Sequence, residues 1–289
     1  MTQLNKKVVE KIIKDALKED IGKGDITTSS LFNKNFKVKA VLISKSNGIL
    51  CGIEVFKNVF LSLSSNFSFR FFFKDGDKIK KGDIVAEIYG PVKELLKGER
   101  TALNFIQRLS GIATETKKMV EKTEGKVKIY DTRKTTPNLR ILEKYAVKTG
   151  GGYNHRFGLY DIILIKDNHI KALMRKEGVD KISAIILGIE RSKKRTGGKV
   201  KIELEVENFK EGIVAYKSGA DIIMFDNAKK EEVLKFRKFL KGKRKVEIEW
   251  SGNVSLKKIE EIKKLSVDRV SVGYITHSAK ALDFSLRVK

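Results

Sequence analysis

Six short apolar runs recur in the second half of the chain and constrain its fold more than any other feature. They occupy residues 127–130, 162–165, 202–206, 222–225, 246–250 and 270–272. Each run has the length of a short buried strand, and most gaps between runs contain amphipathic helical stretches, as at 210–217 and 229–240. Strands that alternate with helices favour parallel βαβ units, so this half of the chain is expected to be α/β.

Polar and charged residues directly follow most of these expected strands. The segments 131–134, 166–169, 226–227 and 251–253 and the single residue Gly273 all stand in such positions. An α/β barrel gathers its active site at the carboxyl ends of its parallel strands. Because six strands are fewer than the eight of a complete barrel, the sequence predicts an open, incomplete α/β barrel.

The first 110 residues follow a different pattern. Apolar spacing predicts helices over 8–17, 53–63 and 91–122, and alternation predicts strands over 38–44 and 67–73. Turn sequences at 74–77 and 81–83 predict tight antiparallel hairpins formed by two further short strands, 78–79 and 84–88. These elements predict a separate α+β domain before residue 110.

The chain is strongly basic, with 61 lysines and arginines against 36 acidic residues, a formal charge of +25. Such a charge attracts nucleic acid, anionic lipid or phosphorylated metabolites. A solvated lysine-rich surface, including one adapted to heat, would give the same number. No RRM, KH or helix-turn-helix signature is present, so a nucleic-acid partner is not expected.

Cysteine usage and hydropathy favour a cytoplasmic protein. Cys51 is the single cysteine of 289 residues, which excludes an internal disulfide and suits a reducing compartment. The first seven residues lack the apolar core of a secretory signal, and the uncharged stretch 59–69 is too short and too rich in serine to cross a bilayer. No membrane association is expected.

Cationic residues are densest between residues 131 and 169, near two expected strand ends and a run of three glycines, 150–152. Arginine forks and lysine charges bind carboxylates and phosphates, and glycine amides allow close approach, so the segment predicts an anion site. A solvated basic loop is the alternative, and it fits poorly with residues tied to strand ends. Zinc is not favoured either, because no closely spaced pair of histidines or cysteines occurs. The cationic residues are Arg133, Lys134, Arg140, His155, Arg156 and Lys166.

Acidic residues and small polar loops follow the later strands. Glu203, Glu205 and Glu207 alternate and so project from one strand face, and Asp226 ends the next strand. Their oxygens suit Mg²⁺ beside bound phosphate, although one or two could instead pair with the basic loops; we expect both. The segments 251–253 and 271–273, the second before a helix expected near residue 277, suit a phosphate, with ordinary turns as the alternative. No Rossmann or P-loop signature occurs.

Together these segments resemble one family, the quinolinate phosphoribosyltransferases or nicotinate-nucleotide pyrophosphorylases. The similar motifs occur in the family's order and span nearly the whole chain. They are 19–28 (EDIGKGDITT), 99–104 (ERTALN), 131–137 (DTRKTTP), 150–156 (GGGYNHR), 165–169 (IKDNH), 203–207 (ELEVE), 225–227 (FDN), 251–253 (SGN) and 271–273 (SVG).

The resemblance implies an activity, a fold and an assembly. The reaction would join quinolinate to 5-phosphoribosyl 1-pyrophosphate and release nicotinate mononucleotide, CO₂ and pyrophosphate in de novo NAD biosynthesis. An N-terminal α/β sandwich domain over 1–110, completed by 275–289, would precede an open α/β barrel over 111–274. The family forms homodimers, sometimes assembled into hexamers, in which the residue matching Arg100 enters the neighbouring subunit's site.

The resemblance also implies residue roles. Lys134, Lys166, Glu205 and Asp226 would be catalytic, and the last two would lie near Mg²⁺, directly or through the ribose and pyrophosphate. The arginine, lysine and histidine side chains would bind quinolinate, and the loops after the last two strands would hold the donor's phosphate. The full set expected to bind substrate is Arg100, Thr132, Arg133, Lys134, His155, Arg156, Lys166, Glu205, Asp226, Ser251, Gly252, Asn253, Ser271, Val272, Gly273 and His277.

Two departures and one rival accompany the resemblance. Asn138 stands where the family usually has glycine, and asparagine tolerates the unusual backbone angles of such a turn. Residues 190–199 are longer and more basic than usual and are expected to form a surface loop. The rival is a related phosphoribosyltransferase, associated with molybdenum transport, that acts on another acceptor. Lys166 favours the quinolinate enzyme because it suits a second acceptor carboxylate, and the intact charged set argues against a catalytically dead scaffold.

Overall fold

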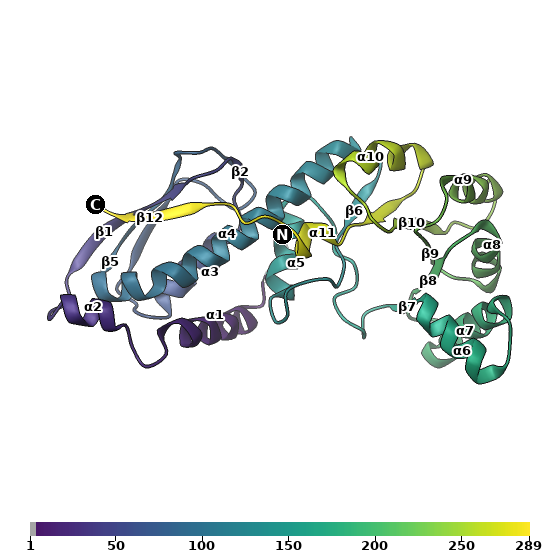
Figure 1. Cartoon of the computed structure of the whole chain (residues 1–289), viewed down its shortest axis with the longest axis horizontal. Coiled ribbons are helices and arrows are strands. Elements are labelled where there is room, and N and C mark those ends of the chain that lie inside the picture. Colours follow the sequence, from purple (N-terminus) through teal and green to yellow (C-terminus); the bar gives the residue numbers. More distant parts are fainter. Residues whose placement is uncertain (1–3) are drawn as a thin grey trace. The chain divides into compact units, whose positions relative to one another are not determined.

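The computed structural model describes residues 4–289 and divides into two compact units, each considered by itself (Figure 1). Unit 1 contains the described residues up to Lys117, together with Thr135–Gly152 and Ile275–Lys289. Unit 2 contains Lys118–Lys134 and Tyr153–Tyr274. Residues 135–152, which the sequence analysis places in the barrel domain, therefore belong to unit 1. Within unit 1, buried Glu143 of this segment forms a 2.9 Å ion pair with Arg108.

Unit 1 contains a four-stranded antiparallel sheet. Its order is β12 (Phe284–Val288), β1 (Lys37–Ser44), β5 (Ile84–Pro91) and β3 (Ser68–Phe71). Because β12 pairs with β1, the last residues of the chain complete a sheet begun near its start, as the ribbon also shows (Figure 1).

The prediction of two hairpins in this region is wrong. The short strand β4 (Lys78–Ile79) pairs with β2 (Gly48–Ile49) instead of with β5. The turn between β4 and β5 bonds to β1: the Gly82 amide donates to Ser44 O, and the Ser44 amide donates to Asp83 O. The eight residues of β5 thereby extend along β1, a longer ladder than a local hairpin would provide.

The helices of unit 1 lie close to their expected positions. They are α1 (Lys6–Ile21), α2 (Ile26–Leu31), α3 (Ile53–Leu61), the unit 1 part of α4 (Val92–Thr123), α5 (Arg140–Thr149) and the end of α11 (Tyr274–His277). Asn5 caps α1 by accepting the Val8 amide, which satisfies an otherwise unpaired donor. On α3, Phe56 and Phe60 are fully buried, so this helix supplies much of the apolar core.

Unit 2 is an open α/β barrel built on six parallel strands. The order is β6 (Lys128–Tyr130), β11 (Arg269–Ser271), β10 (Glu247–Ser251), β9 (Ile222–Asp226), β8 (Ile202–Val206) and β7 (Ile163–Ile165). Strands β6 and β7 are the two edges, so the sheet stays open, as six strands predict. The helices between strands are α6 (Asp167–Glu177), α7 (Lys181–Thr196), α8 (Phe209–Ser218), α9 (Lys230–Phe239) and α10 (Leu256–Ile262), the last followed by a 3₁₀ turn, Lys263–Leu265.

Two local expectations in this half are wrong. Residues 190–196 form the second half of α7 rather than a surface loop. Three cations in its last turn, Lys193 to Arg195, interact favourably with the helix dipole, and Gly197 ends the helix in the left-handed conformation. The helix expected to start near residue 277 instead ends there, since α11 begins at Tyr274.

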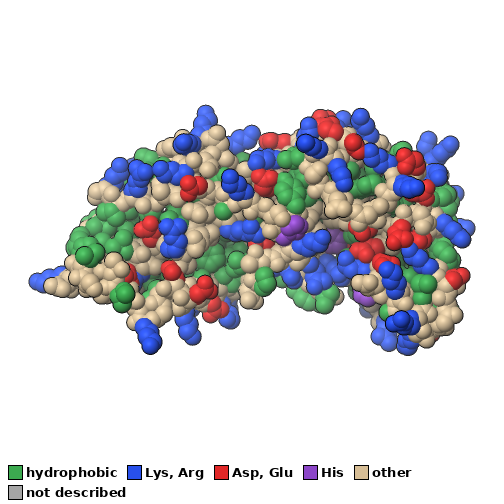
Figure 2. Space-filling view, in the orientation of Figure 1, with side chains coloured by type: hydrophobic (Ala, Val, Ile, Leu, Met, Phe, Trp, Pro, Cys, Tyr) green, Lys and Arg blue, Asp and Glu red, His purple; other side chains and the backbone are tan. Residues whose placement is uncertain are grey.

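The surface carries its charge widely. Lysine and arginine side chains are spread over the visible face and interspersed with acidic ones rather than gathered into a single patch (Figure 2). Among the described residues, none of the helices is both long and apolar enough to span a bilayer.

Candidate active site

A pocket of about 320 Å³ opens at the carboxyl ends of the parallel strands of unit 2. This is the position at which barrels place their chemistry. Its lining joins five cationic side chains, two carboxylates and three hydroxyls over two apolar residues. The lining residues are Thr132, Arg133, Lys134, His155, Arg156, Leu164, Lys166, Glu205, Met224, Asp226, Ser251 and Ser271.

The cations come from three separate segments that the sheet brings together. Arg133 and Lys134 follow β6, His155 and Arg156 precede β7, and Lys166 follows β7. Burial lowers the pKa of Arg156 and the charge of Arg133 lowers it further, while nearby carboxylates oppose the change. Cations this crowded create a strong attraction for an anionic ligand.

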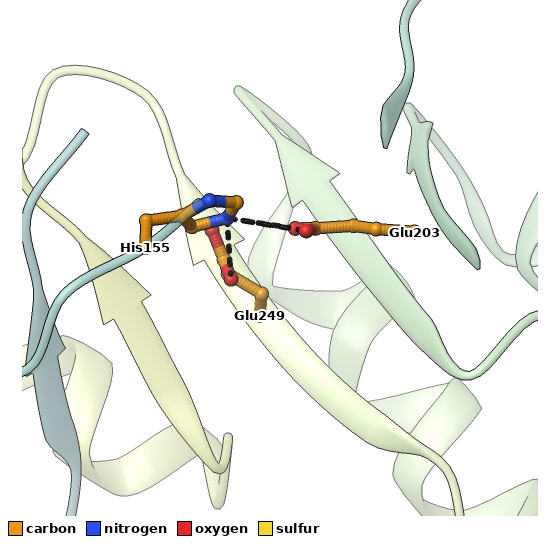
Figure 3. A group of neighbouring side chains, drawn as sticks. All are labelled: His155, Glu203 and Glu249. Carbon is orange, nitrogen blue, oxygen red and sulfur yellow. Dashed lines mark hydrogen bonds and ion pairs between the residues drawn. The ribbon is translucent and has the colours of Figure 1, made fainter. Parts of the chain in front are cut away.

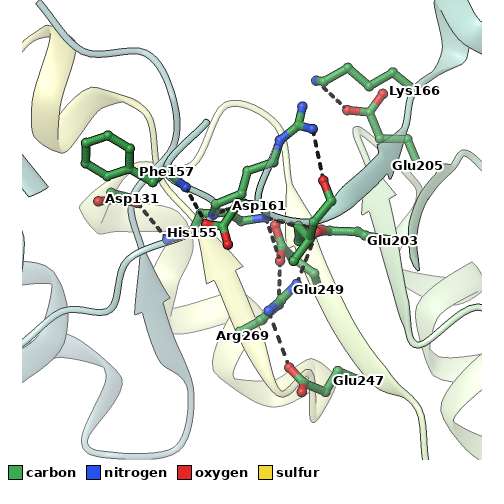
Figure 4. A network of polar contacts seen from close by, with 12 residues as sticks. Asp131, His155, Phe157, Asp161, Lys166, Glu203, Glu205, Glu247, Glu249 and Arg269 are labelled. Atoms are coloured by element: carbon green, nitrogen blue, oxygen red, sulfur yellow. Dashed lines mark hydrogen bonds and ion pairs between the residues drawn. The ribbon is translucent and has the colours of Figure 1, made fainter. Parts of the chain in front are cut away.

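Lys166 and Glu205 form an ion pair inside the pocket. Lys166 Nζ lies 2.8 Å from Glu205 Oε1 (Figure 4). The Asp167 amide donates to Glu205 Oε2 at 3.3 Å. The parallel pairing of β7 with β8 sets this approach. Any anion that binds Lys166 must therefore compete with Glu205 for the same ammonium group.

His155 stands over two buried carboxylates (Figure 3). Its Nε2 atom lies 3.1 Å from Glu203 Oε2 and 3.6 Å from Glu249 Oε2, and both glutamates are fully buried. Burial alone would lower the pKa of His155, but hydrogen bonds and charge from the two glutamates outweigh it and raise the pKa to about 9. Glu203 thus pairs internally, as expected for at least one glutamate of β8.

The other atoms of His155 are also held by the protein. Its amide donates to Asp131 Oδ1 at 2.7 Å, and its Nδ1 accepts the Arg156 amide at 2.8 Å. An acceptor at Nδ1 requires a neutral ring with its one hydrogen on Nε2, where it points to the carboxylates; a ring charged through the two glutamates keeps the Nε2 hydrogen but cannot accept at Nδ1. The neutral ring is thereby fixed in place on both sides.

An unusual backbone occurs in the loop after β9 and in the expected phosphate loop after β10. Gly252 has φ +97°, and Asn227 and Asn253 are also left-handed, with φ +50° and +46°. A Cβ atom on Gly252 would lie 2.2 Å from Asn227 Oδ1 and 2.9 Å from the backbone nitrogen of Asn227. Only glycine fits this position, so the loop after β10 closes tightly on the loop after β9.

Some expected site residues do not line the pocket. Gly252, Asn253, Val272 and Gly273 lie directly beyond the lining serines Ser251 and Ser271. Glu207 lies past the end of β8 and pairs with Lys181 at 2.9 Å. Arg100, an exposed residue of α4, and His277, at the end of α11, belong to unit 1.

The sequence analysis missed Glu249 and Arg269, which lie beneath the pocket. Arg269 Nε is 2.5 Å from Glu249 Oε2, and its Nη2 is 3.4 Å from Glu203 Oε2 (Figure 4). The available signal was a charged residue inside an otherwise apolar strand, which a buried strand rarely carries unless the charge is paired. Asn138, by contrast, adopts the left-handed conformation expected of it, with φ +65°.

Comparisons with known proteins point to one family over nearly the whole chain. Residues 25–110 match the family profile "Quinolinate phosphoribosyl transferase, N-terminal domain", and residues 112–287 match the corresponding "C-terminal domain". A probable nicotinate-nucleotide pyrophosphorylase (carboxylating) of Bacillus subtilis is 43% identical over 99% of this chain and 95% of its own length. The decarboxylating quinolinate phosphoribosyltransferase 1b of Nicotiana tabacum is 35% identical over 96% of this chain and 81% of its own length.

A solved structure gives the same result. The crystal structure of NadC from Streptococcus pyogenes superposes with a TM-score of 0.91 at 40% identity and covers the full length of both chains.

Proposed function

The chain belongs to the quinolinate phosphoribosyltransferase family, and we propose that its basic pocket joins quinolinate to 5-phosphoribosyl 1-pyrophosphate. The products are nicotinate mononucleotide, CO₂ and pyrophosphate, and the reaction serves NAD biosynthesis. One observation supports this use of the pocket above all: five cationic side chains and two carboxylates share a single cavity at the strand ends. A molybdenum-associated relative with another acceptor is not favoured.

The cations answer the first physical difficulty of the reaction. Quinolinate carries two carboxylates, and the donor carries a phosphate and a pyrophosphate, so the reactants repel each other. Arg133 and Arg156 can each form two parallel hydrogen bonds to one quinolinate carboxylate, and Lys166 can neutralise the second carboxylate. Fixed charges in a partly buried pocket stabilise such an encounter without reorganisation of solvent.

The carboxylates suit the donor. As the ring nitrogen bonds to the anomeric carbon, the bond to pyrophosphate breaks and pyrophosphate leaves with its electron pair. Glu205 and Asp226 would bind the ribose hydroxyls and stabilise the positive charge that develops on the sugar. Ser251 and Ser271, with the loops that follow them, would hold the 5-phosphate.

Mg²⁺ fits the same two carboxylates. Glu205 and Asp226 are partly exposed in the pocket and offer oxygen ligands only, the preference of this ion. When bound, the ion would offset charge on the pyrophosphate. Glu205 would be available once the acceptor has drawn Lys166 away from it.

Decarboxylation follows from the first bond. The ribosylated ring nitrogen is cationic and draws in the electron pair left when the adjacent carboxylate departs as CO₂. A proton must then reach that ring carbon, and the ammonium groups of Lys134 and Lys166 are the donors in the pocket that we assign to this step. Positioning and electrostatics supply the rest of the rate.

We further propose a homodimer in which Arg100 completes the neighbouring subunit's site. Arg100 is exposed on α4, as a residue that serves a second chain must be. The lone cysteine, Cys51, is fully buried, which suits a protein of the reducing cytoplasm.

Product analysis tests the proposed function. Purified protein, quinolinate, 5-phosphoribosyl 1-pyrophosphate and Mg²⁺ should yield nicotinate mononucleotide, CO₂ and pyrophosphate in equal amounts. Nicotinate in place of quinolinate should give little product, because it lacks the second carboxylate. Equal turnover of the two acids, or no nicotinate mononucleotide from quinolinate, would contradict the proposal.

A further inference from the structure

Four ionisable side chains form a buried network beneath the floor of the basic pocket (Figure 4). They come from β8, β10, β11 and the loop before β7, so one group of charges links three strands to a loop that lines the site. We refer to them as the buried network: Glu203, Glu249, Arg269 and His155.

The network is held by charge more than by well-aligned hydrogen bonds. Glu203 and Glu249 are fully buried and Arg269 is 6% exposed. Within the described residues, Glu249 Oε1 and Oε2, Glu203 Oε2 and Arg269 Nε and Nη2 have no partner in hydrogen-bond geometry, although ion-pair contacts as short as 2.5 Å connect them. The Arg269 guanidinium also stacks over the Tyr130 ring, 4.9 Å from its centre.

Such a network is a poor way to stabilise a fold. Buried charges lose hydration, and well-packed apolar residues in their place are often as stable or more stable. Its position suggests another purpose, because the one member that reaches the pocket is His155. The Nδ1 atom of His155 in turn accepts a hydrogen bond from the Arg156 amide, and the Arg156 guanidinium lines the pocket.

We propose that Glu249 and Arg269 are positioning residues for the transferase reaction. They fix the His155 ring at the floor of the pocket and, when the ring is neutral, the backbone of Arg156 through Nδ1. The inference rests on the proposed function for its kinetic readout only. The hold on the ring through Nε2 does not depend on the charge of the ring, since that hydrogen points to the carboxylates in both forms. The contact between Nδ1 and the Arg156 amide requires the neutral ring, because a charged ring carries a hydrogen on Nδ1 as well.

A metal ion is the competing explanation of the same cluster. His155, Glu203 and Glu249 offer ligand atoms that all lie within 4.8 Å of one another. However, the Arg269 guanidinium already lies against both carboxylates, at 2.5 and 3.4 Å. It supplies the positive charge that a cation would bring, and a second cation there would be repelled.

The decisive variant removes one charge of each sign. The double substitution Glu249→Gln with Arg269→Met keeps the net charge of the buried network and removes the 2.5 Å ion pair between the two residues. We expect the melting temperature to stay within about 4 °C of the unchanged protein. We expect kcat/KM for quinolinate to fall about 10- to 100-fold through a raised KM, because misplaced binding groups are costly, while KM for the donor changes little.

Glu247→Gln is the matched control. Glu247 lies on the same strand and contacts the same arginine, with Arg269 Nη1 3.4 Å from its Oε2, but no contact joins it to His155 among the described residues. Its kinetics should match those of the unchanged protein. Equal loss of activity in the control and the double variant would overturn the proposal, as would unchanged quinolinate kinetics in the double variant.

A second readout needs no activity. The chain has three histidines, so the ring ¹⁵N resonances of His155 can be assigned by comparison with a His155→Asn variant. They should report hydrogen on Nε2 and should shift in Glu249→Gln but not in Glu247→Gln. Resonances insensitive to Glu249, a stoichiometric shift on adding Zn²⁺ or Mn²⁺, or loss of folding in both Glu249 variants would each reject a positioning role. If the protein makes no nicotinate mononucleotide but these shifts occur, the proposed function fails and the contact network stands.

Discussion

Among single residues, Lys166 offers the most direct test of the proposed substrate binding. Its ammonium group pairs with Glu205 at 2.8 Å, and we assign it to a quinolinate carboxylate. Lys166→Ala should lower kcat/KM about 10- to 100-fold or more, since a charge-assisted contact contributes about 1.5–3 kcal/mol. Steady-state kinetics with varied quinolinate measure the effect.

Lys171→Ala is the control for that variant. Lys171 lies five residues further on and pairs with Asp167 at 2.6 Å, but its side chain is 68% exposed and does not line the pocket. Exposed pairs of this kind contribute little to stability, so kinetics and melting temperature should both be preserved. If both lysine variants lost activity to the same extent, the loss would reflect overall charge rather than the site.

The titration of His155 gives a second prediction at this scale. Carboxylates of Glu203 and Glu249 raise its pKa to about 9, above the usual value of about 6.5. Because the folded value is the higher one, the stabilisation is complete below about pH 6.5 and is lost as pH rises through about 9. Ring NMR signals against pH should show the raised midpoint, and Glu249→Gln should lower it.

Unfolding free energies measured across the same pH range complete that test. The decline between about pH 6.5 and 9 should be smaller in His155→Asn, which lacks the titrating ring. A midpoint at or below 6.5 in the unchanged protein would contradict the prediction. It would show that the Arg156 amide at Nδ1, rather than the carboxylates, sets the charge of the ring.

At the scale of elements, the loop after β10 depends on one glycine. Gly252→Ala combines an unfavourable φ of +97° with contacts of 2.2 and 2.9 Å to Asn227. Gly242→Ala is the matched control, with φ +71° and open space around the added carbon. The control should lose about 1–2 kcal/mol of stability from backbone strain alone. Gly252→Ala should lose more and should also raise KM for the phosphoribosyl donor, which thermal unfolding and kinetics would show; equal effects in both variants would count against a role for this loop.

Elements with a local cause could be predicted from the sequence, and elements with a tertiary cause could not. Strand runs and the polar residues after them predicted the sheet of unit 2 and the lining of its pocket, because apolar periodicity depends on near neighbours. The strand β4 was given the wrong partner because pairing with β2 depends on distant residues. The roles of Glu249 and Arg269 could not be predicted for the same reason. A charged residue is buried inside a strand only where other charges pair with it, and the partners of these two residues are distant in the sequence.

At the scale of the whole molecule, the net charge of +25 is opposite in sign to the charge of the proposed substrates. The cations are spread over the visible surface, so they would act as a general field rather than as a binding site (Figure 2). Such a field steers anions and is screened by salt over about 10 Å at 0.1 M. We expect kcat/KM for quinolinate to fall as ionic strength rises from about 0.02 to 0.3 M. An ionic-strength series in NaCl, with kcat followed separately, would show it; a constant kcat/KM would mean that surface charge has no part in substrate capture.

The shared site is the last property of the whole assembly that can be tested directly. Arg100→Ala and Lys166→Ala should each lower the activity of their own homodimers about 10- to 100-fold or more. If Arg100 serves the neighbouring subunit, a mixed dimer contains one site with both residues intact, and random mixing should restore about a quarter of the original activity. If Arg100 served its own subunit, both sites of a mixed dimer would lack one residue, and no activity would return. The measurement is activity after the two variant proteins are unfolded and refolded together, with each refolded alone as the control. Because only exchange of subunits can restore a site, recovered activity would establish both the oligomer and the direction in which Arg100 acts.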